Sequence, residues 1–268
     1  MGDINTIISA EIYKQSRTRS LKILPGLLIL ATVIIFLGVS AATESLSFGI
    51  ASGFYITAAS LGWIIKAVTF AAVIITSFQI SNEFGMGTVK AAWAQPLSRS
   101  SWYTGKLIYT CLLTWIILIV SALFLVLITS FKYDFSPLIE NDYLMHSEVD
   151  LWIKLGLTLL LSVWVTGVII TSTAVISLLF NGAGSSISLV IAVALLMFML
   201  EVFSVAKPFL LSSYITLPVD QFTLMAKGLP LQMSWKDLIY NTVGFPAGYL
   251  ILSLIAGFYL IKIKEIRS

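Results

Sequence analysis

The sequence has few charged residues and few of the residues that build catalytic or metal sites. Only 11% of its 268 residues are Asp, Glu, Lys or Arg, against about 25% in a typical soluble domain. It contains one cysteine, Cys111, and one histidine, His146. One cysteine excludes an internal disulfide framework, and one histidine argues against a His-based zinc site or a Ser-His triad.

Nucleotide-binding and hydrolase motifs are absent as well. The P-loop pattern G-x-x-x-x-G-K-[ST] does not occur, because the segment 85–90 lacks its spacing, and there is no G-x-S-x-G elbow. We therefore expect no catalytic residue, metal ligand or cofactor in this chain, and no nucleic-acid partner. The protein is expected to move or hold something and not to act as an enzyme.

Apolar residues dominate what is present. They make up 58% of the sequence, and the mean hydropathy is +0.98. A bilayer-spanning helix needs roughly 20 apolar residues, and six runs meet this length: 23–42, 56–80, 107–131, 151–180, 186–205 and 239–261. The expected fold is an all-α integral membrane protein with six transmembrane helices in a single domain, 1–268.

Lysine and arginine are distributed unequally between alternate loops. The two termini and the segment between the second and third runs hold ten basic and four acidic residues, whereas the other loops hold five basic and eight acidic residues. Because basic residues collect on the cytoplasmic side of membranes, both termini are predicted to be cytoplasmic. The expected location is the plasma membrane of a bacterial cell.

The first 22 residues are predicted to form an interfacial helix. Ile8 and Ile12 belong to a set of apolar positions at helical spacing, and Glu11 and Arg17 are polar positions in the same segment. Such an amphipathic helix suits the membrane–water boundary, where it contacts lipid. The alternative is a basic tail that only sets the topology.

The segment 207–238 combines three prolines with apolar clusters. It is too apolar for a free loop and too broken for a straight span. Irregular backbone is tolerated at membrane depth only where protein or a cavity covers it. We expect a pair of short helices that re-enter the outer leaflet, and a folded external loop is the alternative.

Two ionisable residues lie within predicted spans. Lys66 lies about a third of the way along the second run, where it either snorkels outward or lines an internal pathway that attracts an anionic group. Glu201 lies near the external end of the fifth run, and the sequence names no partner for it.

The polar segment 81–106 faces the cytoplasm in this topology. Gly87 is expected to release the membrane helix, Thr88 to cap a short transverse helix, and Pro96 to stop that helix. Glu83 and Arg99 are expected to fix its two ends. An ordinary cytoplasmic loop is the alternative.

The pattern E-x-x-x-G-T, followed by P-x-S-R and G-K, resembles that of the membrane subunits of type-2 ABC exporters. The residues that carry it are Glu83, Gly87, Thr88, Pro96, Ser98, Arg99, Gly105 and Lys106. In that family this segment forms the coupling helix between the second and third spans. The N-terminal helix is similar to the family's connecting helix, and the proline-broken segment is similar to its external re-entrant helices. The pair Trp93-Ala94 departs from the bulky aliphatic residues of many relatives.

The resemblance implies a permease that pairs with a second permease chain, as a homodimer, and docks on two copies of an ABC ATPase. The ATPase would bind ATP and Mg. The implied cargo is a hydrophobic or amphipathic molecule, such as a drug, an antimicrobial peptide or a lipid-like compound, exported from the cytoplasm or the inner leaflet. The alternatives are a stand-alone channel or secondary transporter, and a non-transporting membrane anchor for a soluble partner.

Overall fold

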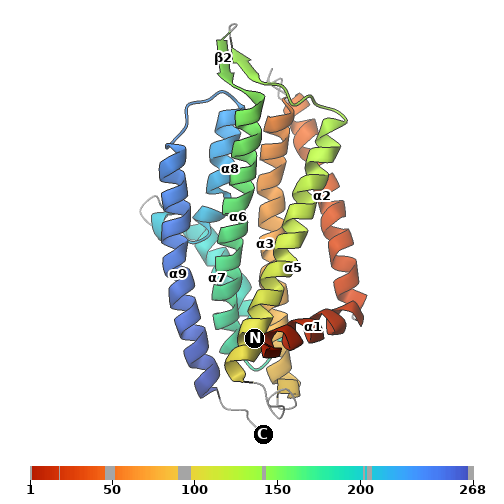
Figure 1. Ribbon diagram of the computed structural model, residues 1–268, viewed down its shortest axis with the longest axis vertical. Helices are drawn as coiled ribbons and strands as arrows, with labels where there is room; N and C mark the ends of the chain where they lie inside the picture. The colour runs from red at the N-terminus through yellow and green to blue at the C-terminus, as the bar shows by residue number, and fades with distance from the viewer. Residues whose placement is uncertain are drawn as a thin grey trace.

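The computed structural model describes residues 2–17, 19–45, 52–89, 98–140, 143–201, 203 and 207–264 (Figure 1). These residues form eight α-helices, one 3-10 turn and one two-stranded hairpin. The elements are α1 (Gly2–Arg17), α2 (Arg19–Ser45), α3 (Gly53–Gly85), α5 (Arg99–Ser130), β1 (Leu138–Glu140), β2 (Tyr143–His146), α6 (Glu148–Leu178), α7 (Ala183–Leu200), η1 (Lys207–Phe209), α8 (Ser213–Ala226) and α9 (Trp235–Ile263).

Five of these helices are long and apolar enough to cross a membrane: α2 from Gly26 onward, α3, α5, α6 and α9. Helix α7 is also apolar but shorter. The prediction of an all-α membrane protein is confirmed at this level. The antiparallel hairpin of β1 and β2 was not predicted from the sequence, and it projects from one end of the bundle (Figure 1). We call this end the hairpin end and the opposite one the α1 end.

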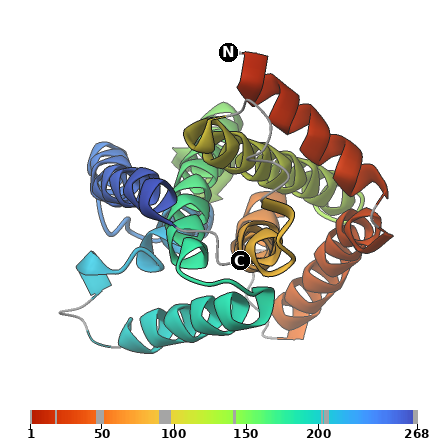
Figure 2. The same ribbon diagram turned by 90° about the horizontal axis from the view of Figure 1, so that it is seen from below.

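Helix α3 is the centre of the bundle, surrounded by α2, α5, α6, α7 and α8 (Figure 2). Its start is fixed by Ser52, whose hydroxyl accepts a hydrogen bond from the amide of Tyr55 at 3.2 Å. Small hydroxyl residues let neighbouring helices approach, and they satisfy their own polar groups within the helix. Thr76, for example, donates to the carbonyl of Ala72 at 2.7 Å.

Helices α7 and α8 occupy successive levels of the bundle, with α7 nearer the α1 end and α8 nearer the hairpin end (Figure 1). Between them the chain leaves the helical path and includes the 3-10 turn η1. Helix α8 buries Val219, Phe222 and Met225 against the core, and the carbonyl of Pro218 accepts a hydrogen bond from Thr158 of α6 at 3.5 Å. The segment 207–238 therefore contains the 3-10 turn η1, the helix α8 and the first turn of α9, where two short re-entrant helices were predicted.

Candidate functional site

Helix α1 lies across the end of the bundle, roughly perpendicular to the long helices (Figures 1 and 2). One face of it packs on α5, and this face repeats every four residues at Ile7, Glu11 and Gln15, all buried. A Cβ at Gly105 of α5 would lie 2.7 Å from Cγ2 of Ile7, so the glycine permits the close approach. At the far end of this contact, Tyr109 donates a hydrogen bond to Oε1 of Gln15 at 2.5 Å.

Four charged side chains join α1 to α3 and α5. Nζ of Lys106 lies 2.6 Å from Oε1 of Glu11 and 2.9 Å from Oε1 of Glu83, and Nζ of Lys14 lies 2.5 Å from that same Glu83 oxygen. The exposed fraction of the side chain is 1% for Lys106, 8% for Glu11 and 10% for Glu83. We call these four residues the α1 charge network. Its two lysines and two glutamates alternate, so each buried charge has an opposite neighbour.

Burial and pairing set the energetics of this network. Removing one partner of a buried ion pair costs about 3–5 kcal/mol because it leaves an uncompensated charge. Lys14 is the exposed member, with 54% of its side chain accessible. Burial alone would lower the pKa of Lys14, but the hydrogen bond and charge of Glu83 and the charge of Glu11 outweigh it and raise that pKa above its usual value. Lys14 therefore carries its positive charge at neutral pH.

The chain turns sharply where α3 ends. Gly87 has φ of +69°, a left-handed conformation that glycine adopts without strain. A Cβ at Gly85 would lie 2.7 Å from the carbonyl oxygen of Asn181, so this position also requires a glycine. The hydroxyl of Thr88 donates to the carbonyl of Glu83 at 3.4 Å and thus closes the end of α3. Thr88 and Val89 are helical again, directly before the residues that lie outside the described part, so the predicted cap role of Thr88 stays a prediction.

The core of the predicted transverse helix, residues 90–97 with Pro96, lies outside the described residues. The following helix begins as predicted, since Ser98 accepts a hydrogen bond from the amide of Ser101 at 3.0 Å. Arg99 then donates to the carbonyls of Lys262 and Lys264 at 3.2 and 3.4 Å. Arg99 therefore ties the start of α5 to the end of α9.

Lys264 makes a second connection at the same end. Its ammonium donates to the carbonyl of Leu178, at the end of α6, and to that of Phe180 at 2.9 Å. It also lies 4.0 Å from the centre of the Phe84 ring at the end of α3. Burial lowers the pKa of Lys264 to about 8. The ends of α3, α5, α6 and α9 are thus linked by two basic side chains.

The predicted interfacial residues divide between two faces of α1. Glu11 faces the protein, whereas 55% of Ile12 is exposed and Ile8 is partly buried. Arg17 is exposed, and its guanidinium lies 4.6 Å from the centre of the Tyr13 ring. The apolar side chains Ile8 and Ile12 therefore lie on the face next to the buried carboxylate, and Ile12 is the more exposed of the two.

Sequence reasoning missed the partners of the two glutamates. Lys106 entered only as part of the G-K pattern, and Lys14 only as one of several basic residues near the N-terminus. The four-residue spacing of Ile7, Glu11 and Gln15 was the available signal, because it places a carboxylate and an amide on one face with an apolar residue. A lysine at the start of an apolar run is the natural partner for such a carboxylate.

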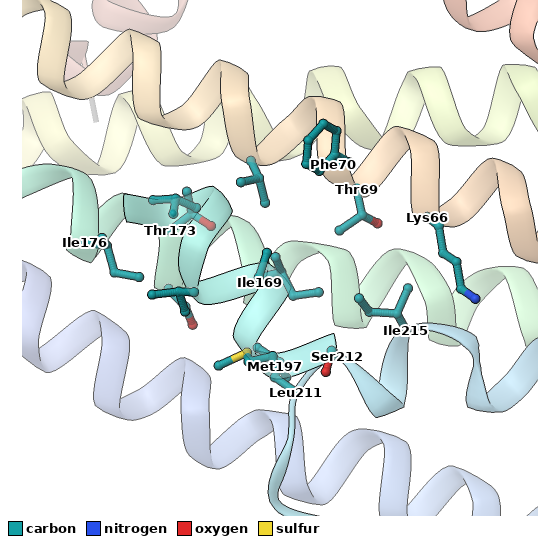
Figure 3. A pocket seen from close by; sticks show the side chains of 15 residues that line it. Lys66, Thr69, Phe70, Ile169, Thr173, Ile176, Met197, Leu211, Ser212 and Ile215 are labelled. Carbon is teal, nitrogen blue, oxygen red and sulfur yellow. The ribbon is translucent and has the colours of Figure 1, made fainter. Parts of the chain in front are cut away.

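Lys66 lies on α3 at the junction of two cavities. One is an apolar groove of about 330 Å³ between α3, α6 and α7 (Figure 3). The other is a charged cavity of about 440 Å³ beside α8. Glu201 lines the charged cavity together with Lys66, Lys207 and Asp220. The two predicted ionisable residues of the spans therefore face the same space.

Among the described residues there is no group of three or more His, Cys, Asp or Glu side chains placed to hold a metal ion. The sequence matches no family model and no curated protein.

Proposed function

We propose that this chain is the permease subunit of a type-2 ABC exporter, driven by two copies of a separate ATPase and paired with a second copy of itself. The α1 charge network is the observation that carries the proposal. It joins α1 to the end of α3 and the start of α5, which are the two helix ends that flank the motif segment. Four motif residues, Glu83, Gly87, Arg99 and Lys106, hold these ends in place.

The proposed mechanism is mechanical. An ATPase that displaces the segment between α3 and α5 would move α1 with it, because a buried and fully paired network resists separation. Arg99 and Lys264 extend the same rigid unit to α6 and α9. Motion applied at the α1 end is then carried along the whole length of α3, which contacts five other helices. The pathway opens or closes through these contacts.

The topology follows from the charge distribution. We place the α1 end in the cytoplasm because the sequence segments of the two termini and of 81–106 together hold ten basic and four acidic residues. The long apolar helices account for five crossings, and α7 followed by α8 makes the sixth. In this arrangement α8 replaces the predicted re-entrant helices. It packs on the core of the bundle, directly after the break between α7 and α8.

The broken α7–α8 region favours a second candidate, a secondary transporter. Discontinuous helices near the middle of the membrane, next to polar groups, are typical of ion-coupled carriers. Glu201, Lys207 and Asp220 are polar groups of this kind, because they line the cavity next to the break between α7 and α8. The two candidates differ in their energy source, since the exporter needs ATP hydrolysis by a partner and the carrier needs an ion gradient.

Reconstitution in vesicles separates these candidates. We expect export of a panel of fluorescent amphiphiles to depend on ATP and on a co-purifying ABC ATPase, and not on an imposed ion gradient. In Glu83→Gln the ATPase should still bind and hydrolyse ATP while the amphiphiles exported per ATP fall. Glu44→Gln is the matched control, because Glu44 pairs with Lys132 at 2.7 Å at the hairpin end. Gradient-driven transport without the ATPase would favour the carrier.

A further inference from the structure

We propose that the protein binds an amphiphile with one apolar chain and one phosphate or carboxylate group. The apolar chain occupies the groove between α3, α6 and α7, and the anionic group lies at Lys66. One copy of the chain supplies all the residues that line this site. Only the statement that this ligand is a transported cargo rests on the proposed function.

Three helices shape the groove in the same way. Each presents residues at positions i, i+3, i+4 and i+7, beginning at Lys66 on α3, at Ile169 on α6 and at Val190 on α7. Four such positions extend over about 10 Å of each helix. Ten of the fifteen lining side chains are apolar, including Phe70, Ile169 and Met197 (Figure 3). The groove therefore suits an extended hydrocarbon chain.

Polar atoms in this groove are mostly satisfied by the protein itself. The hydroxyl of Ser172 bonds to Val168 and to Ser253, at 3.0 and 2.9 Å, and Thr69 lies 3.4 Å from Thr166. A ligand chain here has little to hydrogen-bond with, so a polar ligand would lose its hydration without replacement.

The apolar groove and the charged cavity share Lys66, which lines both. Basic side chains outnumber acidic ones by one in the lining of the charged cavity. The basic residues are Lys66, Lys207 and Lys227, and the acidic residues are Glu201 and Asp220. Lys66 is the charged residue next to the apolar groove, and the carboxylates line only the second cavity. A ligand with an anionic group attached directly to its apolar chain would therefore place that group at Lys66 while the chain lies in the groove.

Two further polar groups lie at the junction. Ser212 lines the groove and Ser213 lines the charged cavity. Their hydroxyl oxygens are inaccessible to solvent and have no hydrogen-bond partner among the described residues. A hydroxyl donor that has no partner in the described protein can turn toward a phosphate or carboxylate oxygen in the cavity that its residue lines.

The volumes favour a small ligand. The groove, at about 330 Å³, is near the lower end of the range for ligand pockets, about 300–1,000 Å³. One chain fills such a groove, whereas a two-chain lipid would leave its second chain outside. Lys66 lies about 20 Å along α3 from the first residue of that helix. Because α3 is long and apolar enough to span the membrane, the groove lies at a depth that suits entry of a ligand from the lipid.

Binding to the purified protein in a non-ionic detergent tests this site. The probes are dodecyl phosphate, dodecyltrimethylammonium and dodecanol, which share one chain, and titration calorimetry measures their affinities. We expect dodecyl phosphate to bind most tightly, and Lys66→Gln to weaken it about tenfold or more while leaving dodecanol unchanged. Lys66→Arg should retain the preference. Palmitoyl-lysophosphatidic acid, added as a fourth probe, shows whether a membrane-derived lipid of the same chemistry binds as well.

Matched variants separate the site from general detergent-like binding. Met197→Trp should block the groove and weaken all probes, whereas Met199→Trp should not, because Met199 is 69% exposed and lies outside the lining. Lys236→Gln removes an exposed lysine away from both cavities and should have no effect. Equal affinity for the charged and neutral probes, or equal loss in Lys66→Gln and Lys236→Gln, would overturn the proposal. These measurements need no ATPase, so their failure is distinct from failure of the exporter assignment.

Discussion

Lys106 of α5 and Glu11 of α1 form an ion pair of 2.6 Å in which only 1% of the lysine side chain is exposed. The same ammonium group lies 2.9 Å from Glu83 of α3. One lysine therefore connects three helices that are far apart in the sequence. Because an ammonium group in this position is stable only while both carboxylates stay in place, the three helices are expected to move together.

Lys106→Met should destabilise the protein by about 3–5 kcal/mol, because it leaves Glu11 and Glu83 without their buried partner. Thermal unfolding of the purified protein measures the change. Lys14→Met should cost about 0–1 kcal/mol, since Lys14 is half exposed. In the double variant Glu11→Gln/Lys106→Met, the loss should be smaller than the sum of the single losses. Additive losses would show that the two side chains do not interact.

Gly105→Ala should push α1 away from α5, because its Cβ would lie 2.7 Å from Cγ2 of Ile7. Overpacking of this kind typically costs about 1–3 kcal/mol. Ile7→Ala removes the obstructing atoms, so the double variant should recover part of the stability lost in Gly105→Ala. Gly156→Ala is the control, since nothing lies within 4 Å of a Cβ there. Equal melting temperatures for Gly105→Ala and Gly156→Ala would contradict the close contact.

The membrane class and most of the helices follow from the sequence, because apolar runs of this length have no other stable environment. The second predicted run, 56–80, lies inside α3, and the third, 107–131, largely inside α5. The fifth run, 186–205, was read as a straight span followed by re-entrant helices. Composition alone does not reveal where α7 ends, since the helix stops at Leu200 while the predicted apolar run continues to residue 205.

The site was predicted only in part, for a different reason. Glu83 and Glu11 were singled out, but each was assigned to a surface, one to a partner protein and one to the membrane boundary. The structure buries both. Their burial depends on Lys106, which lies 95 residues from Glu11 in the sequence, and long-range pairs of this kind leave no periodic pattern. The role of Glu83 in docking an ATPase stays a prediction. In the structure Glu83 would act on that contact through its ion pair with Lys14 of α1.

Cysteine labelling tests the proposed orientation. In a background without Cys111, Ser100→Cys at the α1 end should react with an impermeant maleimide only after the cells are opened. Leu144→Cys on the hairpin should react in intact cells, because this side chain is 60% exposed. Both positions are exposed, so accessibility within the protein does not decide the result. The reverse pattern would place the α1 end outside and exclude docking on a cytoplasmic ATPase.

Lys264 predicts a dependence of stability on pH. Its pKa is about 8 in the folded protein, against 10.5 for an unperturbed lysine, so between these values the unfolded chain binds more protons. The free energy of unfolding should then rise as the pH increases from about 8 to about 10.5. Lys264→Met should flatten the rise, as measured by melting temperature at each pH. Identical pH profiles for the two proteins would contradict the lowered pKa.

Co-purification tests the central claim most directly. This chain is produced together with candidate ABC ATPases, the chain alone carries an affinity tag, and ATP hydrolysis is measured in the eluted fraction. The account predicts that the ATPase elutes with the chain in equal amounts and that its hydrolysis rate depends on the chain. A well-folded chain that elutes alone, beside an ATPase whose activity is the same with and without it, would contradict the assignment as an exporter permease.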